Sequence, residues 1–239
     1  MIPRPETEFL TEHSIKLIIE AFKKVTKGKD RLLNPPLRIL DLCTGSGCIA
    51  LLCQHRLEEA GIRAEITAVD KSQASLELAN KNLAALNAAS IKSKKESVIK
   101  SIVREMDIFN QKDVNQLMME GGPFDVIISN PPYIPTIEWE TLDECVRRWE
   151  DSQALIGDVD GVEDGLAFYR RIANLTQTSK LLSNRYGGMP SLIVEVGHDQ
   201  GQKVQEIFNA TGGFAKTALW IDPWQVQRGV IAWNSRNPI

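Results

Sequence analysis

Short apolar runs alternate with amphipathic segments along most of the chain, and this alternation constrains the fold more than any other feature. Consecutive strands joined by a helix pair in parallel, since the helix returns the chain to the starting edge of the sheet. We therefore predict an α/β fold with a largely parallel sheet covered by helices on both faces. The expected strands are 38–42, 65–70, 101–106, 124–129, 191–196, 217–221 and 229–233, and the expected helices are 6–24, 49–59, 72–86, 113–120, 165–182 and 200–210.

The last two expected strands have no helical pattern between them, which predicts one antiparallel strand near the C-terminus. A length of 239 residues with 43% hydrophobic side chains suits a single α/β domain, so residues 1–239 are expected to form one domain. Two segments are expected mainly as loops, although the first overlaps the start of the expected strand 101–106. They are the basic stretch 90–104, expected as a solvated loop with an RNA-bearing partner as the alternative, and a long loop over 131–162.

The overall charge and the cysteine pattern exclude several classes of protein. A net charge of −3 argues against non-specific binding to nucleic acid, which requires a basic surface. No apolar run approaches the roughly 18–20 residues that span a bilayer. The four cysteines form no CxxC pair and the three histidines lie elsewhere, so we expect reduced thiols and no metal site.

A glycine-containing loop follows the first expected strand, where doubly wound sheets bind their ligands. Its sequence, Asp41-Leu42-Cys43-Thr44-Gly45-Ser46-Gly47, lacks the full G-x-G-x-x-G pattern of pyrophosphate sites. The carboxylate of Asp41 would repel a phosphate but suits a cationic group such as the methionine ammonium of S-adenosylmethionine. Asp70 ends the second strand, where it can accept the hydroxyls of a ribose, and Asp107 ends the third, where it can meet an adenine edge. A dinucleotide site and a purely structural turn are the alternatives.

The fourth expected strand runs directly into Asn130-Pro131-Pro132-Tyr133. A planar amino or amide nitrogen is a poor nucleophile, because its lone pair is delocalised. The Asn130 side-chain oxygen and the Pro131 carbonyl can each accept one of its N–H groups, and these bonds strengthen as positive charge develops on the nitrogen. The two prolines stiffen the turn, and Tyr133 can lie against the planar group. This motif predicts methylation of such a nitrogen by S-adenosylmethionine, with Asn130, Pro131 and Tyr133 as the catalytic residues.

With these motifs, nearly the whole chain resembles the HemK/PrmC family, whose members N5-methylate the glutamine of the Gly-Gly-Gln motif in peptide-chain release factors. The opening segment and the segment after the Asn-Pro-Pro-Tyr motif discriminate this family from adenine methyltransferases. The segments that carry the resemblance are Ile2-Pro3-Arg4-Pro5-Glu6-Thr7-Glu8, the 41–47 loop, Ala68-Val69-Asp70, Ser129 to Ile134, Val146-Arg147-Arg148-Trp149-Glu150 with Ala154-Leu155, and Glu195-Val196-Gly197 with Gln200-Gly201.

The resemblance implies a Rossmann-like class I S-adenosylmethionine-dependent methyltransferase fold and assigns the site residues. The substrate glutamine would meet Asn130, Pro131, Pro132 and Tyr133. Arg4 and Glu6 would line the entrance, with helix-start charges as the alternative explanation. The cofactor S-adenosyl-L-methionine would be bound by Asp41, Cys43, Thr44, Gly45, Ser46, Gly47, Asp70, Asp107, Ile108 and Asn130.

Two departures from the family pattern bear on location and partner. Cys43 stands where bacterial members usually carry glycine and is more similar to fungal or other eukaryotic members, which implies a mitochondrial location, with the cytoplasm as the alternative. The family's N-terminal helical domain, which helps to hold the release factor, is missing from these residues. The resemblance implies a monomer that acts on a release factor, without direct nucleic-acid binding or a membrane. The alternatives are an adenine-N6 methyltransferase acting on DNA or RNA, and a non-catalytic protein with the same fold.

Overall fold

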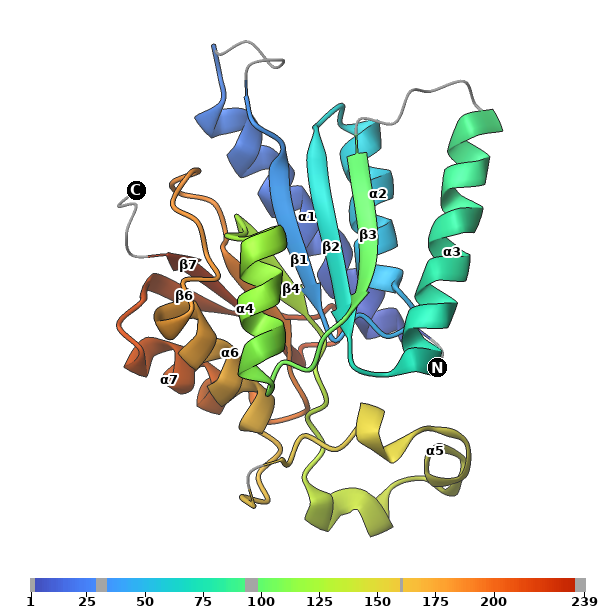
Figure 1. Cartoon of the computed structure of the whole chain (residues 1–239). Coiled ribbons are helices and arrows are strands. Elements are labelled where there is room, and N and C mark those ends of the chain that lie inside the picture. The colour runs from blue at the N-terminus through green and yellow to red at the C-terminus, as the bar shows by residue number, and fades with distance from the viewer. Residues whose placement is uncertain (1–2, 29–33, 93–98, 160, 235–239) are drawn as a thin grey trace.

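A computed structural model describes residues 3–28, 34–92, 99–159 and 161–234 of the chain, and seven strands in these residues form one sheet (Figure 1). The order across the sheet is β3-β2-β1-β4-β5-β7-β6. The strands are β1 Leu37–Leu42, β2 Ala64–Asp70, β3 Ile99–Glu105, β4 Val126–Ser129, β5 Leu192–Glu195, β6 Phe214–Ile221 and β7 Gln227–Asn234.

The strands β1 to β5 pair in parallel, and β7 runs antiparallel to both of its neighbours, β5 and β6. The prediction of a mostly parallel seven-stranded sheet with one antiparallel strand near the C-terminus is therefore confirmed. From β1 the chain proceeds outward to β2 and β3 on one side, and later to β4 and β5 on the other. The direction in which successive strands are added to the sheet therefore reverses between the neighbouring strands β1 and β4. This is a topological switch point, where such sheets bind their ligands beyond the carboxyl ends of the strands.

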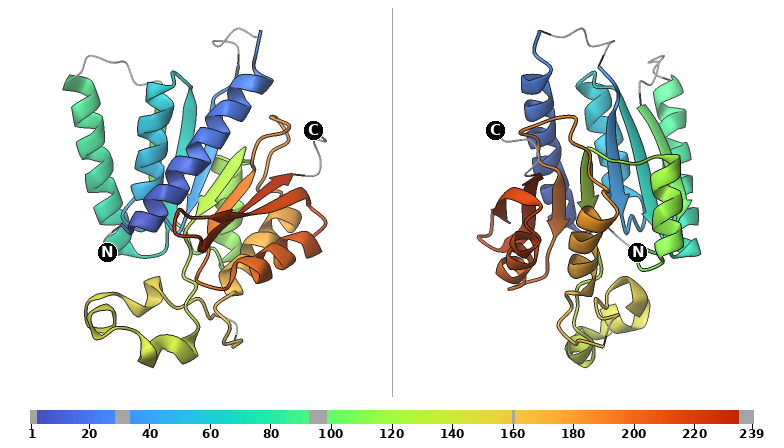
Figure 2. Two further views of the ribbon diagram at one scale, coloured as in Figure 1. Left: turned by 180° about the vertical axis from the view of Figure 1, so that it is seen from behind. Right: turned by 60° about the vertical axis from the view of Figure 1, so that its left-hand side comes forward.

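Helices cover both faces of the sheet (Figure 2). Helices α1 to α3 lie on one face, and α4, α6 and α7 lie on the other. Buried apolar residues of α1 and α2 form one core cluster with the strands, and those of α4, α6 and α7 form another. In the described residues none of the helices has the length and apolar content that crossing a membrane requires. The helices are α1 Pro5–Val25, α2 Cys48–Glu59, α3 Gln73–Lys92, α4 Gln111–Glu120, α5 Glu144–Trp149, α6 Ala167–Thr178 and α7 Gly201–Ala210.

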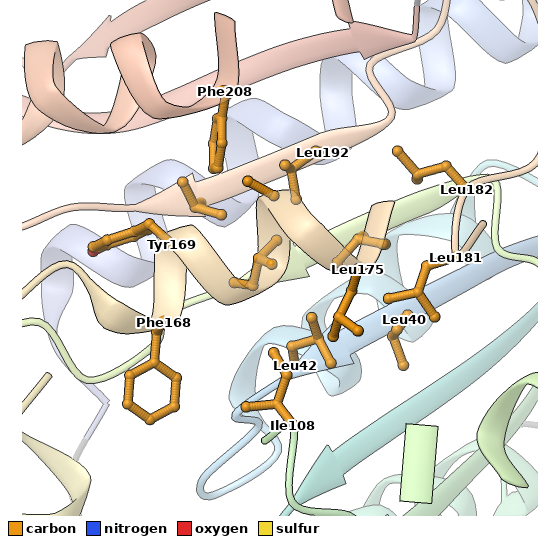
Figure 3. Packing of buried hydrophobic residues seen from close by; sticks show 14 of the residues in the cluster. Leu40, Leu42, Ile108, Phe168, Tyr169, Leu175, Leu181, Leu182, Leu192 and Phe208 are labelled. Carbon is orange, nitrogen blue, oxygen red and sulfur yellow. The ribbon is translucent and has the colours of Figure 1, made fainter. Parts of the chain in front are cut away.

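A large apolar cluster fixes α4, α6 and α7 against the sheet (Figure 3). Tyr169 and Phe208 are fully buried in it, together with Leu192 of β5. The Tyr169 hydroxyl donates a 2.8 Å hydrogen bond to the backbone oxygen of Glu195, so this polar group is satisfied inside the core. The contact also fixes the carboxyl end of β5, where the Glu195 side chain lies next to the site described below.

The segment between β4 and α6 is not the long loop that the sequence predicted. It contains two 3-10 turns, η1 Thr136–Thr141 and η2 Ser152–Ala154, and the short helix α5 between them. In Figure 1 this yellow segment lies beyond the carboxyl ends of the strands. It returns to the turn after β4 at Leu155, whose backbone oxygen accepts hydrogen bonds from the N–H groups of Tyr133 (3.1 Å) and Ile134 (2.9 Å). We call residues 134–159 the insert.

The expectation of a solvated loop over 90–104 is also wrong at both ends. Helix α3 continues to Lys92, and β3 begins at Ile99. Residues 93–98 lie outside the described part of the chain. Strand β3 is an edge strand with partly exposed side chains, so basic residues fit its outer positions: Arg104 forms an ion pair with Glu120 of α4.

Candidate active site

A cavity of about 310 Å³ opens at the carboxyl ends of β1, β2 and β4. One wall is the glycine-containing loop after β1, and the opposite wall is the Asn130 to Tyr133 turn after β4. Residues of the N-terminal segment and of the insert border the same cavity, among them Arg4 and Glu150. The fold therefore brings together motifs that lie more than 100 residues apart in the sequence.

The glycine-containing loop is tightly wound because several of its residues adopt a left-handed backbone. Positive φ angles occur at Cys43 (59°), Gly45 (56°) and Gly47 (83°). Gly45 and Gly47 adopt this conformation without strain, but for Cys43 it is uncommon. Cys43, Thr44, Gly45 and Ser46 line the cavity. Gly47 lies behind them, where an added Cβ would come within 3.2 Å of Ala79 Cβ, so it permits α2 and α3 to approach each other.

Asp41 lies beneath this loop and does not line the cavity. Its Oδ2 accepts hydrogen bonds from Thr44 Oγ1 (2.5 Å) and from the backbone N–H of Ala50 (3.1 Å). Burial raises the pKa of Asp41 to about 7, against the lowering effect of these two bonds. Its Oδ1 is buried without a partner among the described residues. The sequence predicted that Asp41 contacts a ligand ammonium directly. In the structure Asp41 instead supports the loop from behind.

Two further carboxylates border the cavity, as the sequence predicted. Asp70 accepts hydrogen bonds from the N–H groups of Gly45 and Ser72, both at 2.9 Å. Asp107 accepts one from the Phe109 N–H at 2.8 Å. Ile108, next to Asp107 in the chain, is 5% exposed and adds an apolar surface to the cavity. A hydroxyl-bearing ring beside Asp70 and a planar base beside Ile108 match this wall chemically.

Asn130 projects from the end of β4 and is held by the first turn of α1. Its Nδ2 donates a 3.0 Å hydrogen bond to the Thr7 hydroxyl oxygen. The Asn130 side-chain oxygen and the Pro131 carbonyl have no hydrogen-bond partner in the described residues, and both residues line the cavity. Two acceptors are therefore available where the sequence predicted a pair of them.

Tyr133 is anchored through its backbone on both sides. Its N–H donates to the insert at Leu155, and its carbonyl oxygen accepts a 2.8 Å hydrogen bond from Gln200 Nε2. The ring lies against Gly197, where an added Cβ would come within 2.8 Å of the ring. Burial raises the pKa of Tyr133 to about 12, so its hydroxyl stays neutral at physiological pH.

The two entrance residues named from the sequence lie in different places. Arg4 lines the cavity and pairs with Glu150 of the insert at 2.9 Å, so the N-terminal segment and the insert meet at the mouth. Glu6 does not line the cavity, and its carboxylate lies 4.0 Å from Arg228 Nη2.

No function was predicted for Thr7 or Glu195, although both belong to the segments that carry the family resemblance. Each of them is a polar residue inside one of these segments, but the contact of Thr7 with Asn130 and the approach of Glu195 to Thr7 depend on the tertiary fold. In the part of the chain that the structure describes, no group of three or more His, Cys, Asp or Glu side chains is placed to hold a metal ion.

Comparisons with known proteins agree with this geometry. The model of the Eco57I restriction-modification methylase family matches residues 61–156. Among solved structures, the human methyltransferase 10 domain containing protein is similar with a TM-score of 0.57 at 20% identity, covering 98% of this chain and 84% of that one. The CMeT domain of the citrinin polyketide synthase is similar with a TM-score of 0.50 at 16% identity, covering 98% and 58%. These likenesses establish the class I methyltransferase fold.

Curated relatives are more similar in sequence. The release factor glutamine methyltransferase of Chlorobaculum tepidum is 34% identical over 96% of this chain and 66% of its own length. That of Thermodesulfovibrio yellowstonii is 34% identical over 89% of this chain and 61% of its own length. The chain thus spans somewhat less than two thirds of the length of these relatives. Because the identity extends over nearly all of the residues that build the fold and the cavity, the chain belongs to the family of release factor glutamine methyltransferases.

Proposed function

We propose that this protein transfers a methyl group from S-adenosyl-L-methionine to the side-chain amide nitrogen of the glutamine in the Gly-Gly-Gln motif of a release factor. The observation that carries the proposal is the pair of unpartnered acceptors, Asn130 Oδ1 and the Pro131 carbonyl, in one cavity with the glycine-containing loop. The family membership supplies the substrate class.

The cavity wall fits S-adenosylmethionine in its chemistry. The Asp70 carboxylate suits the ribose hydroxyls, the Ile108 surface and Asp107 suit the adenine, and the loop 43–46 would face the methionine part. When it is ionised, Asp41, whose buried Oδ1 has no partner in the described residues, adds negative potential below the loop, which favours a cationic ligand. S-adenosylmethionine supplies an electrophilic methyl group on a sulfonium sulfur.

The residues on the opposite wall would activate the amide by accepting hydrogen bonds from its N–H groups. In the transfer the amide nitrogen would bond to the methyl carbon, the electron pair of the broken carbon–sulfur bond would stay on the sulfur of S-adenosylhomocysteine, and one N–H proton would be released to solvent. Positive charge grows on the nitrogen in the transition state, so hydrogen bonds to Asn130 Oδ1 and the Pro131 carbonyl strengthen there. Pro131 and Pro132 are buried, and Tyr133 is held through both backbone groups, so these acceptors are preorganised.

An adenine amino group has the same two N–H donors, and the match to the Eco57I restriction-modification methylase model keeps nucleic acid as the second candidate substrate. The insert at the mouth argues for a protein substrate instead, because its acidic side chains outnumber its basic ones and would repel phosphates. Its acidic residues are Glu138, Glu140, Asp143, Glu144, Glu150, Asp151 and Asp158, and its basic residues are Arg147 and Arg148.

The test is methyl transfer from labelled S-adenosylmethionine to a release factor, followed by mass spectrometry of the Gly-Gly-Gln peptide. The matched control is the same factor with that glutamine changed to alanine. We expect one methyl group on the glutamine and none on the control. Label on DNA or RNA would instead support the adenine-N6 reaction. Cofactor binding by the full-length protein without transfer to any of these would support a non-catalytic role.

The location and assembly of the protein remain predictions. We propose a mitochondrial location, supported by the cysteine at position 43, and a monomer. Imaging of the tagged full-length protein in its native cell would test the first, and sedimentation at micromolar concentration would test the second. Signal confined to the cytoplasm would contradict the mitochondrial prediction, and a stable dimer would contradict the monomer.

A further inference from the structure

The orientation of the Asn130 amide decides whether the site can accept an N–H group. The oxygen and nitrogen ends of an asparagine side chain have nearly the same shape, so only hydrogen-bond partners distinguish them. Asn130 Nδ2 donates to Thr7 Oγ1 at 3.0 Å, which leaves Oδ1 for the substrate. Were the amide reversed, an NH₂ group would face the target nitrogen, and both would be donors.

Thr7 can hold this orientation because its own hydroxyl proton is engaged elsewhere. Thr7 is 4% exposed, and its hydroxyl faces the Glu195 carboxylate, whose charged form it stabilises. An ionised carboxylate can only accept, so the Thr7 hydroxyl must donate to it. The oxygen of Thr7 then offers only a lone pair, and Asn130 must present its NH₂ end.

We infer that Thr7 and Glu195 are positioning residues for methyl transfer: ionised Glu195 orders the Thr7 hydroxyl, and Thr7 in turn aims the Asn130 oxygen at the target amide. The inference rests on the proposed function, because it concerns the acceptor of that reaction. It assigns a role to a buried carboxylate that touches neither substrate nor cofactor directly.

The surroundings of Glu195 make this arrangement sensitive to protonation. Its side chain is 3% exposed, and its Oε2 is buried without a hydrogen-bond partner in the described residues. Tyr169 donates to its backbone oxygen and not to the carboxylate. Burial is the largest effect and raises the pKa of Glu195 to about 7; the Thr7 hydrogen bond lowers it, Glu6 raises it, and Arg228 and Arg4 lower it.

Protonation of Glu195 would reverse the direction of the chain of hydrogen bonds. The neutral carboxyl can donate to Thr7, whose proton is then free to bond the Asn130 oxygen and turn the NH₂ end toward the cavity. We therefore expect kcat to fall as the pH drops through about 7.

The experiment compares Thr7→Val, Thr7→Ser and Glu195→Gln with the wild type in release-factor methylation between pH 6 and 8.5. Thr11→Val is the matched control, because Thr11 is buried one turn further along α1 and donates only to the Thr7 backbone oxygen at 2.6 Å. Binding of S-adenosylhomocysteine and thermal unfolding are measured for every variant. Absence of methylation by the wild type would refute the proposed function itself, whatever the variants do.

Given an active wild type, we expect Thr7→Val to lower kcat at least about tenfold, because valine cannot accept the hydrogen bond that keeps the Asn130 oxygen directed toward the substrate. Thr7→Ser and Thr11→Val should stay within about twofold, and all should bind S-adenosylhomocysteine normally. Glu195→Gln should have a lower kcat and a shallower decline below pH 7, because its amide does not titrate, whereas Asp41, with a pKa of about 7, titrates in both proteins. Wild-type kcat in Thr7→Val, or an unchanged acidic decline in Glu195→Gln, would overturn the inference. If Thr7→Val does not fold, the pH profile of Glu195→Gln decides alone.

Discussion

Asp70 Oδ2 accepts a 2.9 Å hydrogen bond from the backbone N–H of Gly45. This contact joins the carboxyl end of β2 to the glycine-containing loop after β1, within one wall of a cavity that both residues line. Since each carboxylate oxygen has two lone pairs, Asp70 can hold the loop and still accept hydroxyl groups of a ligand. One side chain therefore shapes the cavity and offers the acceptor inside it.

Replacement of Asp70 by alanine should weaken binding of S-adenosylhomocysteine strongly. A hydrogen bond to a charged group contributes about 1.5–3 kcal/mol, so the dissociation constant should rise roughly 10- to 100-fold by calorimetry. The control is Glu77→Ala, which removes the same charge from an exposed position on α3 outside the cavity. Equal binding by the two variants would contradict the assignment of Asp70.

Position 43 should accept glycine far better than a β-branched residue, because its φ angle is 59°. Cys43→Gly relieves the left-handed strain but loses some packing, so the free energy of unfolding should stay within about 1 kcal/mol of the wild type. Cys43→Val should lose about 1–3 kcal/mol, since a β-branched side chain tolerates this backbone least. Denaturant titration of both variants measures the difference. Equal stability of the valine and glycine variants would refute the backbone argument.

The strands and the main helices could be predicted closely because their apolar periodicity is strong: β2 and α2 differ from expectation by a single residue at one end. The insert could not be predicted, since α5 has six residues and is stabilised by its ends: Asp143 accepts a 2.7 Å hydrogen bond from the Cys145 N–H. Such a short helix has too few turns to show a period.

The candidate site divides in the same way. The acceptor motif was recognisable because its residues are contiguous, but Thr7 and Asn130 are 123 positions apart and meet only through the packing of α1 against the sheet. Asp41 illustrates the opposite case. Its position near the carboxyl end of a strand indicated a ligand contact, but burial and its bonds to Thr44 and Ala50 place it behind the wall.

Gly165 should be essential for the shape of the catalytic turn. Its φ is 69°, and an added Cβ would overlap the carbonyl oxygen of Tyr133. We expect Gly165→Ala to lower kcat at least about tenfold and to reduce stability by about 1–3 kcal/mol. Gly161 has a φ of 80° with open space around its Cβ position, so Gly161→Ala is a control with backbone strain alone. Comparable kcat values for the two variants would show that the contact with Tyr133 is unimportant.

Asn130→Ala should abolish turnover while leaving cofactor binding within a few fold. The substitution removes the acceptor for the target N–H, whereas the loop 43–46 and Asp70 on the other wall are untouched. Single-turnover methylation and calorimetry with S-adenosylhomocysteine separate the two effects. Turnover above about one tenth of the wild type would dismiss the role of this side chain.

Glu195→Gln should make the protein more stable at alkaline pH, in contrast to its expected loss of activity. The pKa of Glu195 is about 7 in the folded chain and 4.5 as the ordinary value, so between these pH values the folded state binds a proton that the unfolded state does not. The free energy of unfolding then falls as the pH rises through this window, by on the order of 3 kcal/mol for this group. The raised pKa of Asp41 changes the free energy of unfolding in the same direction, but Asp41 is present in both proteins and its contribution cancels in the comparison. Denaturation curves at pH 5 and pH 8 should therefore show that the variant gains stability relative to the wild type as the pH rises. A difference between the two proteins that does not change with pH would mean that Glu195 is not held as a buried, costly charge.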